Sequence, residues 1–167
     1  MKIAIDSNIF LNLMFEEPGW DNCGRLLDSV HSHQHEAVIS SIQLSEMYTP
    51  FERAKDPASR ERLCETIKKA GVKVRDVDEE TAALSSRIRG TERTPKGRWL
   101  ALADSIVLAT AQIEGSEILY TLDLDFLKVT GPVNVAAPGM SLEEWGKVYG
   151  PKKNSRSKTK NSMKSVC

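Results

Sequence analysis

Short apolar runs alternate along the chain with longer segments in which apolar residues recur every three or four positions. Such short runs predict buried β-strands, and the helical spacing predicts amphipathic α-helices. Predicted strands cover residues 1–6, 37–40, 72–77, 118–121 and 133–136. Predicted helices cover residues 7–15, 19–30, 58–70, 78–90, 99–113, 125–128 and 141–148, and a further helix starts at a Ser40–Gln43 capping box and carries Glu46.

This alternation of strands and helices predicts an α/β fold, because parallel strands need helical crossovers that then cover both faces of the sheet. We therefore expect three layers, α/β/α, around a mostly parallel central sheet of four to five short strands. Ligands of such sheets bind beyond the carboxyl ends of the strands. The sequence contains no glycine-rich phosphate loop, which argues against a nucleotide site of the usual kind.

The length of 167 residues fits one domain, which we place at residues 1–150, followed by a basic tail at residues 151–167. The formal net charge is zero, but the tail has no acidic residue, so the predicted domain is net acidic. We expect the tail to be disordered, and it either contacts a polyanion or is only a solvated terminus. Its cations are Lys152, Lys153, Arg156, Lys158, Lys160 and Lys164.

The hydropathy and the cysteine content of the chain bear on its cellular compartment and on its possible structural sites. No apolar run reaches the length of a membrane span, and no signal peptide precedes the first strand, so we expect a cytoplasmic protein with no membrane contact. The cysteines Cys23, Cys64 and Cys167 show no pairing pattern, which argues against a disulfide scaffold or a zinc site.

Carboxylates recur at the ends of the predicted strands or in the adjoining helices. Two carboxylates about 4 Å apart repel by roughly 4 kcal/mol at an effective dielectric constant near 20. A cluster of them must therefore take up protons or bind a hard divalent cation. The acidic residues in question are Asp6, Glu46, Asp104, Asp123 and Asp125.

Each acidic residue taken alone has an ordinary structural role. Asp6 can cap the helix that follows it, and Glu46 can be a solvent-exposed helix residue. Asp104 is harder to explain, since it is the one charge in the apolar segment 99–113, unless it caps a helix that begins at Ser105. Of Asp123 and Asp125, we expect one to cap the next helix and the other to face the site. A shared site at one sheet edge explains all of these positions together.

The segments that carry these acids resemble the PIN-domain nucleases, above all the VapC-type ribonuclease toxins. The resemblance covers residues 1–137 and depends on the order and spacing of four short motifs. It implies that Asp6, Glu46, Asp104 and Asp123 are catalytic and bind Mg²⁺ or Mn²⁺, with Asp125 as the alternate to Asp123, and that Ser7, Asn8 and Thr121 are supporting polar residues. The motifs are Asp6-Ser7-Asn8, Glu46 in its helix, Ala103-Asp104-Ser105 and Thr121-x-Asp123-x-Asp125-Phe126.

The same resemblance implies an activity and partners. The expected reaction is hydrolysis of RNA phosphodiester bonds by a metal-bound water, which leaves a 5′-phosphate and a 3′-hydroxyl. The expected partners are RNA, an antitoxin that inserts a basic side chain among the carboxylates, and a second copy of the chain. In the family, the region that corresponds to residues 51–69 commonly forms a helical clip used in dimerisation.

Three further groups of residues, namely basic residues, histidines and tryptophans, each allow two interpretations. Arg93, Lys96 and Arg98 are candidates for RNA phosphate contacts, or they belong to a solvated charged loop. The alternating His31, His33 and His35 suggest a transition-metal site, although histidines in a polar loop are more often solvated. The tryptophans can stack on bases, but their apolar helical context favours core packing. They are Trp20, Trp99 and Trp145.

Competing functions fit the sequence less well. Asp6-Ser7-Asn8 lacks the second acid, two residues on, of haloacid-dehalogenase-like phosphatases, and Lys128 is poorly placed for a receiver-like domain. A noncatalytic PIN-like module that binds RNA or protein has no need for the retained acids. A housekeeping RNA-processing nuclease without an antitoxin also remains open.

Overall fold

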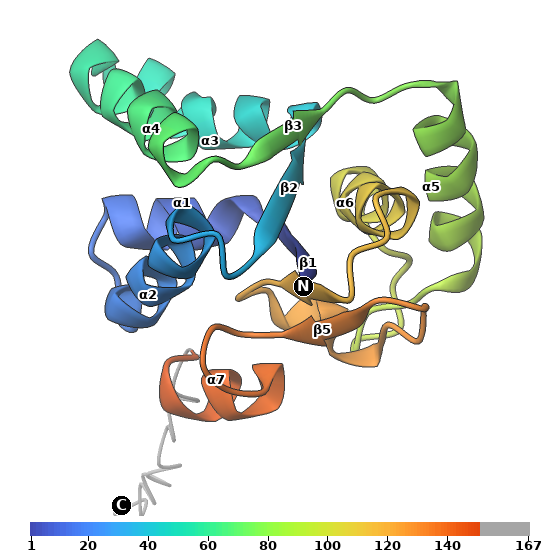
Figure 1. The fold of residues 1–167 in the computed structure, drawn as a ribbon. Coiled ribbons are helices and arrows are strands. Elements are labelled where there is room, and N and C mark those ends of the chain that lie inside the picture. The colour runs from blue at the N-terminus through green and yellow to red at the C-terminus, as the bar shows by residue number, and fades with distance from the viewer. Residues whose placement is uncertain (151–167) are drawn as a thin grey trace, which may run out of the picture.

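The computed structural model describes residues 1–150 of the chain, so the predicted tail at 151–167 lies outside the described residues. Five parallel strands form one sheet in the order β3-β2-β1-β4-β5 (Figure 1). This arrangement confirms the predicted α/β fold with a parallel sheet. The strands are β1 (Lys2–Ile5), β2 (Glu36–Ser40), β3 (Lys73–Arg75), β4 (Ile118–Tyr120) and β5 (Asn134–Ala136).

Helices cover both faces of this sheet. Figure 1 shows α1, α2 and α4 on one side of the sheet and α5 and α6 on the other. No helix within residues 1–150 is both long and apolar enough to cross a membrane. The helices are α1 (Ser7–Met14), α2 (Trp20–His31), α3 (Ser41–Ala54), α4 (Pro57–Ala70), α5 (Glu79–Thr91), α6 (Leu102–Ile113), the 3-10 helix η1 (Leu124–Lys128) and α7 (Leu142–Val148).

The central strand β1 and helix α6 form the middle of the core. Ile3 and Ile5 of β1 are completely buried, because β1 lies between β2 and β4 and is covered on both faces. Helix α6 is buried over most of its length, from Ser105 to Ala111, where it packs on β1 and β2. Both elements end or begin at the same edge of the sheet, so the core fixes Asp6 and Asp104 in space.

Two of the three tryptophan predictions are wrong. Trp99 is 49% exposed because α6 begins at Leu102, which leaves Trp99 in the preceding loop. Trp20 is 44% exposed at the first position of α2. The core space beside Gly19 is filled instead by Trp145, which is 4% exposed and whose ring leaves no room for a Cβ atom at Gly19. Core packing is therefore confirmed for Trp145 alone.

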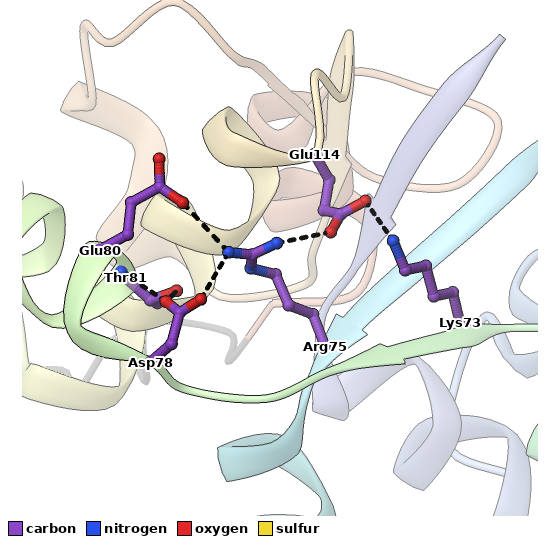
Figure 2. A network of polar contacts seen from close by, with 6 residues as sticks. All are labelled: Lys73, Arg75, Asp78, Glu80, Thr81 and Glu114. Atoms are coloured by element: carbon purple, nitrogen blue, oxygen red, sulfur yellow. Dashed lines mark hydrogen bonds and ion pairs between the residues drawn. The ribbon is translucent and has the colours of Figure 1, made fainter.

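A charged network attaches the edge strand β3 to the helices behind it (Figure 2). The Arg75 guanidinium pairs with Glu114, just after α6, at 3.0 Å and with Asp78, which caps α5, at 2.9 Å. Lys73 also contacts Glu114, at 2.8 Å. Because Arg75 and Glu114 are both mostly buried, this network fixes where α5 begins and where α6 ends.

Candidate active site

Asp6 lies at the carboxyl end of β1 and is 7% exposed. It is the N-cap of α1, since its Oδ1 accepts a hydrogen bond from the Ser7 backbone N–H at 2.7 Å. Its Oδ2 accepts hydrogen bonds from Thr121 Oγ1 at 2.6 Å and from Asn8 Nδ2 at 2.8 Å. Asp6 is thus both a cap and a carboxylate held in one orientation by several donors.

A hydrogen-bonded web joins the turn after β1 to the turn after β4. Thr121 Oγ1 accepts hydrogen bonds from Asn8 Nδ2 at 3.1 Å and from the Asp123 backbone N–H at 3.0 Å. Asn8 Oδ1 accepts one from the Leu122 backbone N–H at 3.1 Å. The structure therefore places Asn8 and Thr121 beside Asp6.

Gln43 is a member of this web that sequence reasoning did not assign to the site. Its Oε1 accepts a hydrogen bond from the Ser40 N–H at 2.8 Å, the contact that the capping pattern predicts. Its Nε2 donates to the Ile5 carbonyl at 2.9 Å and lies 3.5 Å from Asp6 Oδ1. Gln43 thus links the start of α3 to the end of β1. This contact could have been predicted only from the fact that β1 and β2 are neighbours in the sheet.

Glu46 approaches the site from the second turn of α3. The Ser7 hydroxyl donates hydrogen bonds to Glu46 Oε2 at 3.0 Å and to Asp6 Oδ1 at 3.3 Å. A single hydroxyl therefore bridges two of the predicted acids, which places Ser7 where the sequence suggested a supporting residue.

Asp104 lies in the first turn of α6, whose N-cap is Ala101, so the alternative of a cap at the start of the helix is wrong. Burial, together with the negative charges of the other acids, raises the pKa of its carboxyl to about 7. The largest of these charge effects comes from Asp6, followed by Asp123, Glu46 and Asp125. Asp104 thus shares one electrostatic environment with every predicted acid.

Asp6 has a raised pKa as well. Burial and, to a smaller extent, repulsion by Glu46 and Asp123 raise it to about 6, although the hydrogen bonds from Thr121 and Ser7 favour the charged form. The surroundings of Asp6 and Asp104 therefore make their negative charges unfavourable, and a bound cation would offset this effect.

Asp123 and Asp125 have different surroundings. Asp123 caps η1, as its Oδ1 accepts the Asp125 backbone N–H at 2.8 Å. The Asp125 carboxylate pairs with Arg98 at 3.2 Å. Asp123 also repels Asp104 more strongly than Asp125 does. These observations favour Asp123 as the fourth acid and leave Asp125 as a partner of Arg98.

The donor set suits a hard cation, because the charged groups that repel Asp104 are all carboxylates. Within residues 1–150, no three histidine, cysteine or acidic side chains stand close enough together to enclose an ion on their own.

The histidines do not form a site together. His31 Nδ1 lies 2.7 Å from the Lys69 carbonyl on α4, whereas His33 and His35 line a cavity at the opposite, amino edge of the sheet. The described residues thus give no support to a transition-metal centre on this segment.

Replacement of Thr121 by valine tests the web. Valine keeps the shape but removes the 2.6 Å hydrogen bond to Asp6, so we expect a loss of about 10- to 100-fold in any metal-dependent activity. We also expect a loss of about 1–3 kcal/mol in the free energy of unfolding, measured by urea denaturation, because buried donors lose their acceptor.

The matched control is Thr110→Val in α6. Thr110 is as deeply buried as Thr121, but its Oγ1 has no hydrogen-bond partner within residues 1–150. We expect near-wild-type activity and stability for this variant. Equal effects of the two substitutions would contradict a specific role for Thr121.

The chain is similar to a known domain family and to several solved structures. The family model described as PIN domain matches residues 3–132. One similar structure is VapBC2 from Rickettsia felis bound to a DNA fragment from its promoter. The matched chain superimposes with a TM-score of 0.66 at 18% identity, over 82% of this chain and 98% of the matched chain. VapC20 from Mycobacterium tuberculosis, a Sarcin-Ricin loop cleaving toxin, superimposes with a TM-score of 0.59 at 16% identity, over 75% of this chain and 92% of that one.

A third similar structure is a toxin-antitoxin complex from Klebsiella pneumoniae. It superimposes with a TM-score of 0.56 at 24% identity, over 81% of this chain and 97% of the matched chain. No curated protein sequence matches the chain. At these identities the structural likeness shows a common fold, and the family model shows the relationship in sequence.

Proposed function

This chain belongs to the PIN-domain family, and from that premise we propose that it is a Mg²⁺- or Mn²⁺-dependent ribonuclease and the toxin of a type II toxin–antitoxin pair. The observation that carries the proposal is the group of carboxylates at the carboxyl edge of the sheet, where the Ser7 hydroxyl joins Asp6 to Glu46 and where burial and the neighbouring acids raise the pKa of Asp104 to about 7. A fold without a cation has no evident reason to bury a group that its neighbours repel.

In this proposal Asp6, Glu46, Asp104 and Asp123 would hold the cation. When bound, the metal would supply a water of lowered pKa and charge stabilisation for the phosphoryl oxygens. Thr121, Asn8 and Ser7 donate hydrogen bonds that favour the charged form of Asp6 and hold it in one orientation. This support reduces the reorganisation that catalysis would otherwise require.

We infer the partners from the negative charge of the site and from the similar solved structures. Several similar structures are toxin–antitoxin complexes, which supports an antitoxin as partner. A group of carboxylates is complementary to a basic side chain, so we propose that the antitoxin inserts one among them. We further propose a cytoplasmic homodimer, with a PIN-like domain at 1–150, a basic tail at 151–167 and single-stranded RNA as substrate.

Cleavage products test the proposed chemistry. The purified chain is incubated with end-labelled single-stranded RNA and Mg²⁺ or Mn²⁺, and the ends are mapped enzymatically. We expect 5′-phosphate and 3′-hydroxyl ends, and no products from Asp6→Asn. Asp21→Asn, on the exposed start of α2, is the matched control and is expected to cleave normally. The absence of cleavage with either metal would support a noncatalytic PIN-like module instead.

Expression in a bacterial host tests the toxin role separately. We expect growth arrest from the wild-type chain and none from Asp6→Asn, with rescue by a small reading frame encoded beside the gene. RNA cleavage in vitro without growth arrest would favour a housekeeping nuclease.

A further inference from the structure

The loop between α5 and α6 is a closed turn. The Gly97 N–H donates to the Thr94 carbonyl at 2.9 Å, and the Thr94 N–H donates to the Arg98 carbonyl at 2.8 Å. Arg93 and Trp99 face each other across an antiparallel bridge. Pro95 and the positive φ of Gly97 (77°) suit this turn. Arg93, Lys96 and Arg98 are therefore presented by ordered backbone.

Trp99 and Arg93 form a stacked pair on this turn. The Arg93 guanidinium carbon lies 3.2 Å from the centroid of the Trp99 ring, and Arg93 also donates to the Gly97 carbonyl at 3.0 Å. Trp99 nevertheless stays 49% exposed. It borders an open groove of about 600 Å³ between α5 and α6 that Arg89 and Leu102 also line.

The turn lies at the margin of the acidic site. Arg98, next to Trp99, pairs with Asp125 at 3.2 Å, and Asp125 in turn donates its N–H to Asp123. Leu102, in the groove, belongs to the same first turn of α6 as Asp104. The turn that carries Trp99 is therefore joined to the acidic site through Arg98 and through the first turn of α6.

We propose that Trp99 and Arg93 form a base-stacking platform for a nucleotide that adjoins the scissile phosphate of single-stranded RNA; this inference rests on the proposed nuclease function. The acids repel a polyanion, so the affinity for RNA must come from neighbouring groups. Aromatic rings and arginine planes stack on any base, and the flanking cations are complementary to phosphates.

The second exposed tryptophan gives the contrast. Trp20 is exposed to a similar extent, but it follows Glu16 and Glu17 in sequence and precedes Asp21, so its surroundings would repel RNA. Exposure alone does not distinguish the two rings. The charge of their neighbours does, and it makes Trp20 the matched control for Trp99.

The test is RNA binding without cleavage. Fluorescence anisotropy is measured with a labelled single-stranded RNA in EDTA for the wild-type chain and for Trp99→Ala, Trp99→Phe and Trp20→Ala. Because stacking on one aromatic side chain contributes about 1–3 kcal/mol per base, Trp99→Ala should weaken binding by about 5- to 100-fold. Trp99→Phe should keep most of the affinity, and Trp20→Ala should bind like the wild type.

Single abasic substitutions along the RNA sharpen the test. At one position the loss of the base should weaken wild-type binding but leave Trp99→Ala binding unchanged, as the stacking partner is already absent. If no variant cleaves RNA but this coupling is present, the platform stands and the nuclease proposal fails. Equal RNA affinity of Trp99→Ala and Trp20→Ala would overturn the platform. A change of mass in light scattering for Trp99→Ala, with unchanged RNA affinity, would also overturn it and assign the groove to a contact between copies.

Discussion

Asparagine in place of Asp104 is expected to lower RNA cleavage by at least about 100-fold and, in the absence of metal, to make the fold more stable at pH 8. The first effect is expected because even indirect metal partners contribute 10- to 100-fold, and Asp104 is proposed as a direct one. The second is expected because asparagine removes a charge that Asp6, Asp123 and Glu46 repel. A residue kept for stability would show the opposite result.

The stability gain depends on pH in a defined direction. The Asp104 carboxyl has a pKa of about 7 in the folded chain and about 3.8 in the unfolded one. Because the folded state binds this proton more tightly than the unfolded state does, protonation of Asp104 stabilises the fold. This stabilisation is complete below pH 4 and is lost as the pH rises towards 7. Asp104→Asn does not titrate. The free energy of unfolding of this variant should therefore equal that of the wild type at pH 4 and exceed it by roughly 1–2 kcal/mol at pH 8. The partial solvent exposure of Asp104 reduces this difference.

Urea unfolding in EDTA at pH 4, 6 and 8 measures this difference. Asp28→Asn in α2, which lies outside the site, is the control and should show no comparable trend. An Asp104→Asn chain that is less stable than the wild type at pH 8 would contradict the account of the acidic cluster.

Mn²⁺ is expected to stabilise the wild-type fold strongly at pH 8 and hardly at pH 5. A ligand at about 100 times its dissociation constant adds about 2.7 kcal/mol to the free energy of unfolding. Protons compete for the same oxygens, and the pKa values of Asp6 and Asp104 are about 6 and 7. The ionised ligands therefore become available only as the pH rises through this range.

Thermal denaturation with and without Mn²⁺ at the two pH values tests this expectation. The shift in Tm should disappear in Asp104→Asn and persist in Thr110→Val. A Tm shift that is the same at pH 5 and pH 8, or that survives in Asp104→Asn, would place the ion elsewhere on the protein.

Much of the fold could be predicted because it follows from local pattern. Buried strands such as Ile3 to Ile5 and amphipathic helices such as α4 have distinct spacings, and short strands between helices leave few topologies open. The edge strand β3 is shorter than predicted, because it has only β2 as a neighbour, at Val38 to Ser40.

The gathering of Asp6, Glu46 and Asp123 at one edge could be predicted for the same reason, since each follows a strand or lies in the helix after one, whereas Asp104 lies in the first turn of a helix that follows another helix. The web around Asp6 could be predicted only in part. Thr121 and Asn8 were found through the family motif, whereas Gln43 reaches Asp6 because β1 and β2 are neighbours, which local sequence does not encode.

Long-range charge pairs and exposure could not be predicted. The pair of Arg98 with Asp125 joins residues 27 positions apart, and that of Arg75 with Glu114 joins residues 39 apart. Trp99 has an apolar side chain beside an apolar helix, so the pattern favours the core. Its exposure follows from the tight turn at 94–97 and from where α6 begins.

The most direct test of the central claim is a metal add-back experiment on cleavage. The purified chain is stripped with chelator, dialysed and incubated with labelled single-stranded RNA, first without metal and then with Mg²⁺ or Mn²⁺. The account predicts no cleavage before addition, restored cleavage afterwards in the wild type, and no restoration in Asp6→Asn or Asp104→Asn. Cleavage that persists without metal, or that returns equally in all three chains, would contradict a metal-dependent nuclease built on these acids.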